Sequence, residues 1–153
     1  MKHLVLIFLF VPMLANACTG FVVGFRGING AFDNAAFIDY AKRLNYCSKA
    51  YDWDEVAVAR KMIKQLRVPY QLYGFSKGAA SVAEVLRYKD TPKPEYVITM
   101  GAYRTTDVNF DRYGIRYDNY FDASGIGQKS PGRFLKIPHF LIQQEVNRIH
   151  LPM

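Results

Sequence analysis

The chain has few cysteines and histidines and no long run of charge of one sign. Its 153 residues include two cysteines, three histidines and one tryptophan. No cysteine–histidine spacing gives a zinc signature, and we expect neither a metal nor a cofactor. The formal net charge is +7, but the basic residues are scattered and form no block of like charge. This pattern excludes a nucleic-acid footprint and leaves room for weak association with an anionic membrane or envelope surface.

The chain also lacks an apolar run long enough for a comfortable transmembrane helix. Its first apolar stretch, residues 4–14, follows a basic start and precedes residues 15–17, Ala-Asn-Ala, which have the A-x-A form of a signal-peptidase site. We therefore expect residues 1–17 to be a signal peptide and residues 18–153 to form a single domain, secreted or periplasmic. Acylation of Cys18 in a lipoprotein is the alternative.

Strand-like and helix-like segments alternate along the rest of the chain. The strand-like segments are compact apolar runs without strict alternation, which is typical of strands buried on both faces. The pattern predicts an α/β fold of three layers, with a mostly parallel sheet of about five strands between helices. We expect strands over residues 20–25, 46–53, 69–75, 95–102 and 117–123. We expect helices over residues 31–44, 55–66, 77–88 and 139–149, and a loop over residues 124–133.

Ser76 lies between two glycines in the sequence Gly74-Phe75-Ser76-Lys77-Gly78, which matches the pattern G-x-S-x-G. This pattern marks a nucleophilic serine when it follows a strand and opens a helix, as it does here. The sharp turn exposes the hydroxyl at the amino end of the helix, where free N–H groups stabilise a developing oxyanion. The alternative is a serine in an ordinary strand–helix turn.

A nucleophilic serine needs a base and an acid that orients the base. We predict that His139 is the base, because it precedes the last helix and can reach the carboxyl edge of the sheet, where ligands bind in such folds. We predict that Asp122 is the acid, because it ends the last expected strand, and Asp107 is the alternative acid. Both follow the chain order Ser, Asp, His.

The oxyanion hole requires two donors. The N–H group of Lys77 follows the nucleophile, and a second donor is expected from the loop after the first strand, FRGING, for which we choose Ile28. Its N–H group would face the serine if Gly27 allows a tight turn.

Three stretches give the chain a resemblance to the α/β-hydrolases, and more narrowly to class 3 lipase-like serine hydrolases. VVGFRGING resembles the strand and F-R-G turn of that group, LYGFSKGAA resembles its nucleophile elbow, and ITMGAYRTTDVNF resembles the next strand and turn. DNYFDASG stands where the group places its acid, ahead of a late histidine. Ile28 departs from the threonine or serine common after F-R-G, and Lys77 departs from the usual apolar residue. The resemblance implies a minimal version of the fold with a triad of Ser76, Asp122 and His139.

The same resemblance places Cys18 and Cys47 at the starts of neighbouring parallel strands. It therefore implies a disulfide at the sheet edge opposite the site, worth roughly 3 kcal/mol by chain entropy. An exported chain meets the oxidising conditions that such a bond needs.

The resulting expectation is a lipase or esterase that cleaves small-molecule or lipid esters through an acyl-enzyme. A thioesterase, an acyltransferase or a hydrolase of cell-envelope esters would use the same residues. The alternative from another functional class is a binding protein that keeps the hydrolase fold but has lost catalysis. The acyl chain, the alcohol and the oligomeric state stay open.

Overall fold

A computed structural model of the chain describes residues 18–102, 110–124 and 132–150. The expected signal peptide over residues 1–17 and the alternative acid Asp107 lie outside the described residues. Within them, no helix is long and apolar enough to cross a membrane.

The described chain forms one six-stranded sheet in the order β2-β1-β3-β4-β5-β6, and every pair of neighbouring strands is parallel. The strands are β1 (Phe21–Phe25), β2 (Cys47–Tyr51), β3 (Tyr70–Phe75), β4 (Tyr96–Met100), β5 (Tyr117–Phe121) and β6 (Arg133–Phe134). This confirms the predicted α/β class and the five expected strands. The two-residue β6 lies at the end of a segment that was expected to be loop throughout.

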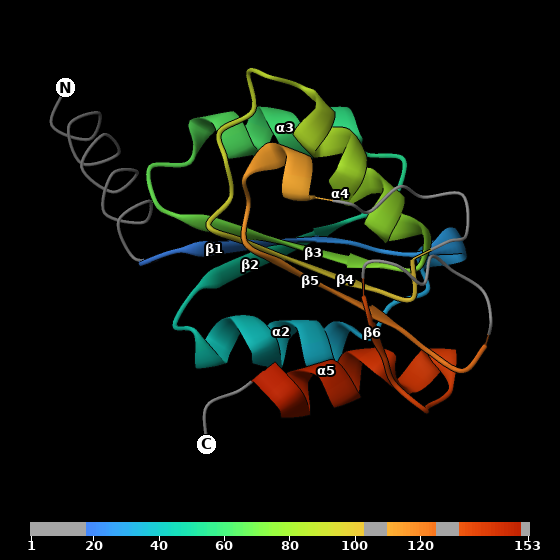
Figure 1. Cartoon of the computed structure of the whole chain (residues 1–153). Helices are drawn as coiled ribbons and strands as arrows, with labels where there is room; N and C mark the ends of the chain where they lie inside the picture. Colours follow the sequence, from blue (N-terminus) through green and yellow to red (C-terminus); the bar gives the residue numbers. More distant parts are fainter. Residues whose placement is uncertain (1–17, 103–109, 125–131, 151–153) are drawn as a thin grey trace, which may run out of the picture.

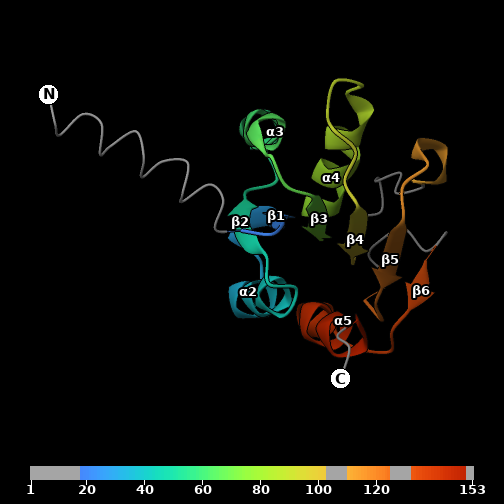
Figure 2. The same ribbon diagram turned by 90° about the vertical axis from the view of Figure 1, so that its left-hand side faces the viewer.

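Four helices flank the sheet in the described chain, as predicted. Helices α2 (Asn34–Arg43) and α5 (Ile142–His150) cover one face, and α3 (Val56–Gln65) and α4 (Lys77–Arg87) cover the other (Figures 1 and 2). Short 3-10 turns add η1 (Ile28–Gly30), η2 (Asp111–Tyr113) and η3 (His139–Leu141). The last predicted helix therefore opens with a 3-10 turn that carries His139.

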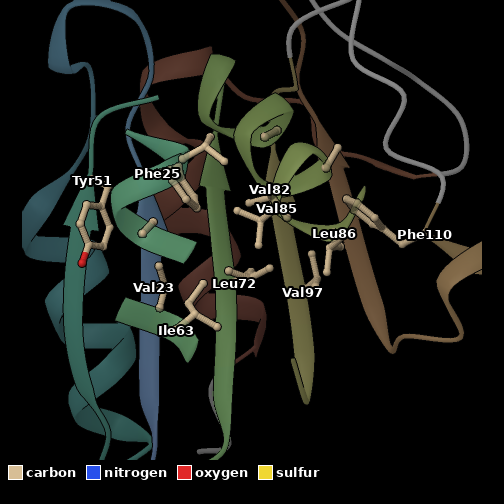
Figure 3. Close-up of a cluster of buried hydrophobic side chains, with 14 of the residues drawn as sticks. Val23, Phe25, Tyr51, Ile63, Leu72, Val82, Val85, Leu86, Val97 and Phe110 are labelled. Carbon is tan, nitrogen blue, oxygen red and sulfur yellow. The ribbon is translucent and has the colours of Figure 1, made fainter. Parts of the chain in front are cut away.

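Successive residues of the central strands face opposite layers, which explains their continuous apolar sequence. Val22 and Tyr73 belong to the core under α2 and α5, whereas Val23 and Leu72 belong to the core under α3 and α4. Figure 3 shows the second core, in which Ile63 of α3 and Val82 of α4 pack toward Leu72. Side chains fill the space between the sheet and the helices on both faces. A binding site is therefore expected at the ends of the strands.

Cys18 and Cys47 form a disulfide with their Cα atoms 5.6 Å apart. It joins the segment before β1 to the start of β2, as the resemblance implied. Such bonds are typical of proteins that mature in an oxidising, extracytoplasmic compartment. The sulfur of Cys18 is occupied by this bond, so acylation of Cys18 does not fit this structure.

Candidate functional site

Ser76 occupies a backbone conformation that serine rarely adopts. It connects the end of β3 to the start of α4 with φ 55° and ψ −120°. Non-glycine residues at positive φ are uncommon, and such strain persists where the surroundings enforce it. Here the Ser76 N–H group donates to the Met100 carbonyl at 2.9 Å, and the Ser76 carbonyl accepts from the Ala79 N–H group at 3.1 Å. The turn between β3 and α4 is thus held from both sides.

The two glycines around Ser76 allow α4 to approach the sheet closely. A Cβ atom on Gly78 would collide with the Phe25 carbonyl group at the end of β1. A Cβ atom on Gly74 would lie 2.8 Å from Ala79 Cα and 2.8 Å from Val82 Cγ2. Both glycines of the G-x-S-x-G pattern are therefore required by packing, which places the amino end of α4 directly behind Ser76.

His139 and Asp122 form a close pair at the same edge of the sheet. His139 Nδ1 lies 2.6 Å from Asp122 Oδ2, and the Asp122 side chain is 1% exposed. The other carboxylate oxygen, Oδ1, accepts a hydrogen bond from the Ser124 N–H group at 2.9 Å. The Phe75 ring packs against the imidazole with 4.8 Å between ring centroids. A buried carboxylate held in this way fixes both the position and the tautomer of the imidazole.

Gly101 lies against this pair at the end of β4. It follows β4 with φ 56°, and a Cβ atom on it would lie 2.5 Å from His139 Cε1 and 2.9 Å from Asp122 Oδ2. The glycine is therefore needed both for its backbone conformation and for the space that the imidazole occupies. A glycine directly after a central strand at the carboxyl edge was the available sequence signal.

Ser76 and His139 open into one pocket of about 350 Å³. No hydrogen bond joins the Ser76 hydroxyl to the His139 imidazole in this structure. In unliganded sites this contact is often long and tightens when substrate binds. The pocket has a mainly apolar lining with two polar side chains besides the serine and histidine: it comprises Ile28, Ala31, Phe32, Asp33, Phe75, Ser76, His139, Phe140 and Gln143.

The loop after β1 lies against the serine, as expected for an oxyanion loop. A Cβ atom on Gly27 would lie 3.1 Å from Ser76 Cβ. The turn is closed by hydrogen bonds from the Gly27 N–H group to the Ala31 carbonyl at 2.8 Å and from the Ala31 N–H group to the Ile28 carbonyl at 3.1 Å. Ile28 lines the pocket. Lys77 is the first residue of α4, where N–H groups have no acceptor within the helix.

The charged side chains next to the oxyanion loop and the serine have partners outside the pocket. Lys77 Nζ lies 3.4 Å from the centroid of the Trp53 ring. Arg26 Nη1 lies 3.3 Å from Asp52 Oδ1. Neither cation lines the pocket that holds Ser76. The lining of the pocket therefore contains no lysine or arginine, although Lys77 stands where the resembled group usually has an apolar residue.

Gln143 is the site residue that sequence reasoning missed. It is 1% exposed, and its Oε1 accepts from the Asp33 N–H group at 2.7 Å. Its Nε2 donates to the Asp33 carbonyl and to the Tyr73 hydroxyl, both at 3.2 Å. Burial raises the pKa of Tyr73, so its hydroxyl stays protonated. Gln143 thereby ties the helix that follows His139 to β3 and to the loop after β1. The sequence signal that could have pointed to Gln143 is its position one helical turn after His139.

The remaining histidine of the described chain is far from this pocket. His150 ends α5, contacts the Tyr120 hydroxyl and packs near the Tyr96 ring at the start of β4. Burial lowers its pKa. The structure thus brings His139, and not His150, to the carboxyl edge with Ser76.

Within residues 18–102, 110–124 and 132–150, no group of three or more histidine, cysteine or acidic residues could hold a metal ion. The fold and this pocket define the molecule as an α/β protein with a parallel six-stranded sheet and a serine, histidine and aspartate at its carboxyl edge. The chain matches no protein-family model, no curated protein and no solved structure.

Proposed function

We propose that this protein is an exported serine hydrolase that cleaves carboxylic esters, a small lipase-like or esterase-like member of the α/β-hydrolases. The observation that carries the proposal is the pairing of His139 with the buried Asp122, because His139 lines the same pocket as Ser76, a serine held at positive φ. Three segments distant in the chain supply these groups. An ordinary strand–helix turn would need neither the strain nor the buried carboxylate.

The geometry supports a two-step mechanism. His139 Nε2 takes the proton of the Ser76 hydroxyl as the oxygen attacks the ester carbonyl, and Asp122 stabilises the imidazolium that forms. The N–H groups of Lys77 and Ile28 stabilise the oxyanion. His139 then gives the proton to the leaving alcohol, and water releases the acyl group from Ser76 by the reverse sequence of transfers.

The pocket favours an ester with an apolar acyl part. Ile28 is 44% exposed and Phe140 is 73% exposed beside the serine. Large apolar side chains at the mouth of a pocket are typical of sites that receive apolar ligands. A thioester substrate or an alcohol acceptor would fit the same chemistry, so thioesterase and acyltransferase activities belong to the same proposal.

Fluorophosphonate labelling of residues 18–153 with the disulfide formed tests the proposal. We expect the wild type to be labelled and both Ser76→Ala and His139→Ala to lose labelling, because the probe reacts with activated serines. Ser48→Ala and His150→Gln serve as matched controls outside the pocket and should keep it.

A folded wild type that is not labelled would refute the hydrolase and favour a binding protein on the same fold. If labelling succeeds, esters and thioesters of graded acyl length, with and without an added alcohol, identify the preferred reaction.

A further inference from the structure

The loop between β2 and α3, residues 51–55, contacts both segments that carry the expected oxyanion donors. We call it the Trp53 loop. The oxyanion loop after β1, which includes Ile28, is joined to it on one side, and the amino end of α4, which begins at Lys77, is joined to it on the other. No residue of the Trp53 loop lines the pocket that holds Ser76. An effect of this loop on the proposed reaction therefore passes through the two segments that it contacts.

Backbone and side chain both join the oxyanion loop to the Trp53 loop. The Arg26 N–H group donates to the Tyr51 carbonyl at 2.8 Å, which extends the pairing of β1 with β2 by one residue. Arg26 Nη1 lies 3.3 Å from Asp52 Oδ1. The Asp52 side chain is 52% exposed, so the ion pair adds little stability but fixes the direction of Arg26. Ile28, two residues later, is thereby placed relative to the Trp53 loop.

The Trp53 ring and the Trp53 carbonyl group hold the first turns of α4. The Ser81 hydroxyl, in a residue that is 2% exposed, donates to the Trp53 carbonyl at 2.5 Å. Lys77 Nζ lies 3.4 Å from the centroid of the Trp53 ring, and an indole attracts a cation more strongly than any other aromatic side chain. Lys77 and Ser81 are four residues apart and so share one side of the helix. The two contacts together fix the rotation of α4 about its axis, and with it the place of the Lys77 N–H group.

The Trp53 loop is itself a closed turn. The Asp52 N–H group donates to Glu55 Oε2 at 2.8 Å, and the Glu55 N–H group donates to the Asp52 carbonyl at 3.0 Å. The Glu55 carboxylate thus caps the turn as in one half of a capping box, while the Asp52 carboxylate pairs with Arg26. A turn closed in this way keeps its contact with the oxyanion loop and its contact with α4 at a constant separation.

We propose that Trp53 is a positioning residue for the oxyanion hole. It holds the Trp53 loop on α4, and the same loop holds the segment that carries the second donor. Two N–H groups stabilise one oxyanion fully only when both are held within about 0.5 Å of the productive position. The inference rests on the proposed function, because an oxyanion hole has a role only if Ser76 is the nucleophile.

The test compares substitutions at two aromatic rings that each carry a cation. Trp53→Leu removes the ring under Lys77, and Trp53→Phe keeps an aromatic face there. Tyr88→Leu is the matched control: Arg60 Cζ lies 3.6 Å from the Tyr88 ring centroid in the same groove between α3 and α4, but Tyr88 follows the other end of α4. Hydrolysis of p-nitrophenyl butyrate by residues 18–153 gives kcat and KM. Fluorophosphonate labelling gives a rate and a final extent, and chemical denaturation gives the stability of each variant.

We expect Trp53→Leu to lower kcat and the labelling rate by about ten-fold, less than the loss of a complete oxyanion donor. KM should change little, because the oxyanion interaction is made only in the transition state. The final extent of labelling should match the wild type, since every folded chain still reacts. Trp53→Phe should recover most of the rate, and Tyr88→Leu should react like the wild type.

A second pair of variants tests whether Trp53 acts through Lys77. Lys77→Met keeps the ring and should slow labelling in the same direction. Combined with Trp53→Leu it should add no further loss, because both changes break one contact. Trp53 is the only tryptophan of the chain, so its fluorescence reports on this contact without any reaction. Lys77→Met should change the emission spectrum, and Lys61→Met, at an exposed position of α3, should leave it unchanged.

The possible failures are distinguishable. A labelled wild type with an unchanged rate in Trp53→Leu would overturn the inference and leave the proposed hydrolase intact. An equal loss in Tyr88→Leu, or a rise in KM that accounts for the loss, would also overturn it, because a general loosening of α4 would then be responsible. A folded wild type without labelling would overturn the proposed function and, with it, the oxyanion hole that Trp53 is inferred to position.

Discussion

At the scale of single residues, the proposed site depends on backbone conformation as much as on chemical groups. Ser76 has positive φ without being glycine, and Gly101 has positive φ next to the imidazole. The first residue accepts strain to present a hydroxyl, and the second supplies the space in which His139 meets Asp122. Substitutions in this site can therefore be tested separately for their effects on stability and on reactivity.

Replacement of Ser76 by glycine or alanine measures the strain directly. Both changes remove the hydroxyl, but only glycine tolerates φ 55° without steric cost. We expect Ser76→Gly to unfold with a free energy about 1 kcal/mol higher than Ser76→Ala. Chemical denaturation followed by circular dichroism provides the measurement. The pair Ser81→Gly and Ser81→Ala, inside α4, should show the opposite sign, because glycine weakens a helix interior. Equal stabilities at position 76 would contradict the strain.

Replacement of Asp122 by asparagine tests the orienting carboxylate. The amide keeps the shape of the side chain but no longer stabilises the imidazolium and favours the wrong tautomer. We expect the rate of fluorophosphonate labelling to fall by about three to four orders of magnitude, with the fold retained. Asp118→Asn, in the strand β5 that precedes Asp122 and partnered with Tyr96, is the matched control and should label at nearly the wild-type rate. A small effect at position 122 would direct attention to Asp107.

At the scale of elements, the sequence pattern predicted the arrangement well because most strands are buried on both faces. The compact apolar runs identified β1, β3 and β4, and all four described helices lie where the sequence predicted them. Strand β6 escaped prediction because its two residues, Arg133 and Phe134, are exposed and too few to show a period. It exists because Leu135 N–H and Phe121 C=O continue the pairing with β5.

The site was predictable to the extent that it follows strand ends. Ser76 and Asp122 each come directly after a strand, so topology alone brings them to one edge. Gln143 could not be found in this way, because its role depends on side-chain contacts across three elements. To predict those contacts, one must know which face of α5 is turned toward the sheet.

Helix α5 carries two buried amide side chains, of which only one lines the pocket of Ser76. Comparing them separates the packing of the helix from its proposed effect on the site. Gln143 lies in the pocket, whereas Asn147, one turn later, donates from Nδ2 to the Ala36 carbonyl at 2.6 Å. We expect Gln143→Met to lower the unfolding free energy by about 1–3 kcal/mol, because the Asp33 backbone groups lose their buried partner. Asn147→Leu should cost less, because Asn147 Oδ1 already lacks a partner in the described chain.

The two variants should differ more clearly in reactivity. We expect Gln143→Met to slow labelling of Ser76 at a temperature where both variants are folded, and Asn147→Leu to leave the rate near that of the wild type. Labelling rates and denaturation curves on the same samples provide the measurement. Equal labelling in both variants would limit Gln143 to a structural role.

At the scale of the whole molecule, two hydrophobic layers and one covalent link hold a short chain together. The disulfide joins the segment before β1 to the edge strand β2 across a sequence separation of 29 residues. It lies at the opposite edge of the sheet from Ser76 and His139.

Reduction of the disulfide should weaken the fold without altering the chemistry of the site. We expect the unfolding free energy to fall by about 3 kcal/mol on reduction, with labelling of the protein that stays folded unchanged. Denaturation with and without reductant measures this difference. The variant Cys18→Ser with Cys47→Ser should match the reduced protein and show no response to reductant. Loss of labelling in the folded reduced protein would show that the two edges are coupled.

The position of His139 has a consequence for the order in which the protein matures. The serine and both expected oxyanion donors precede residue 80, but the histidine arrives with the last described elements, η3 and α5. A chain that crosses a membrane with its amino terminus leading can close the Cys18–Cys47 bond early, while the base is still behind it. The proposed triad is therefore incomplete until the segment with η3 and α5 has been made and has folded against the sheet.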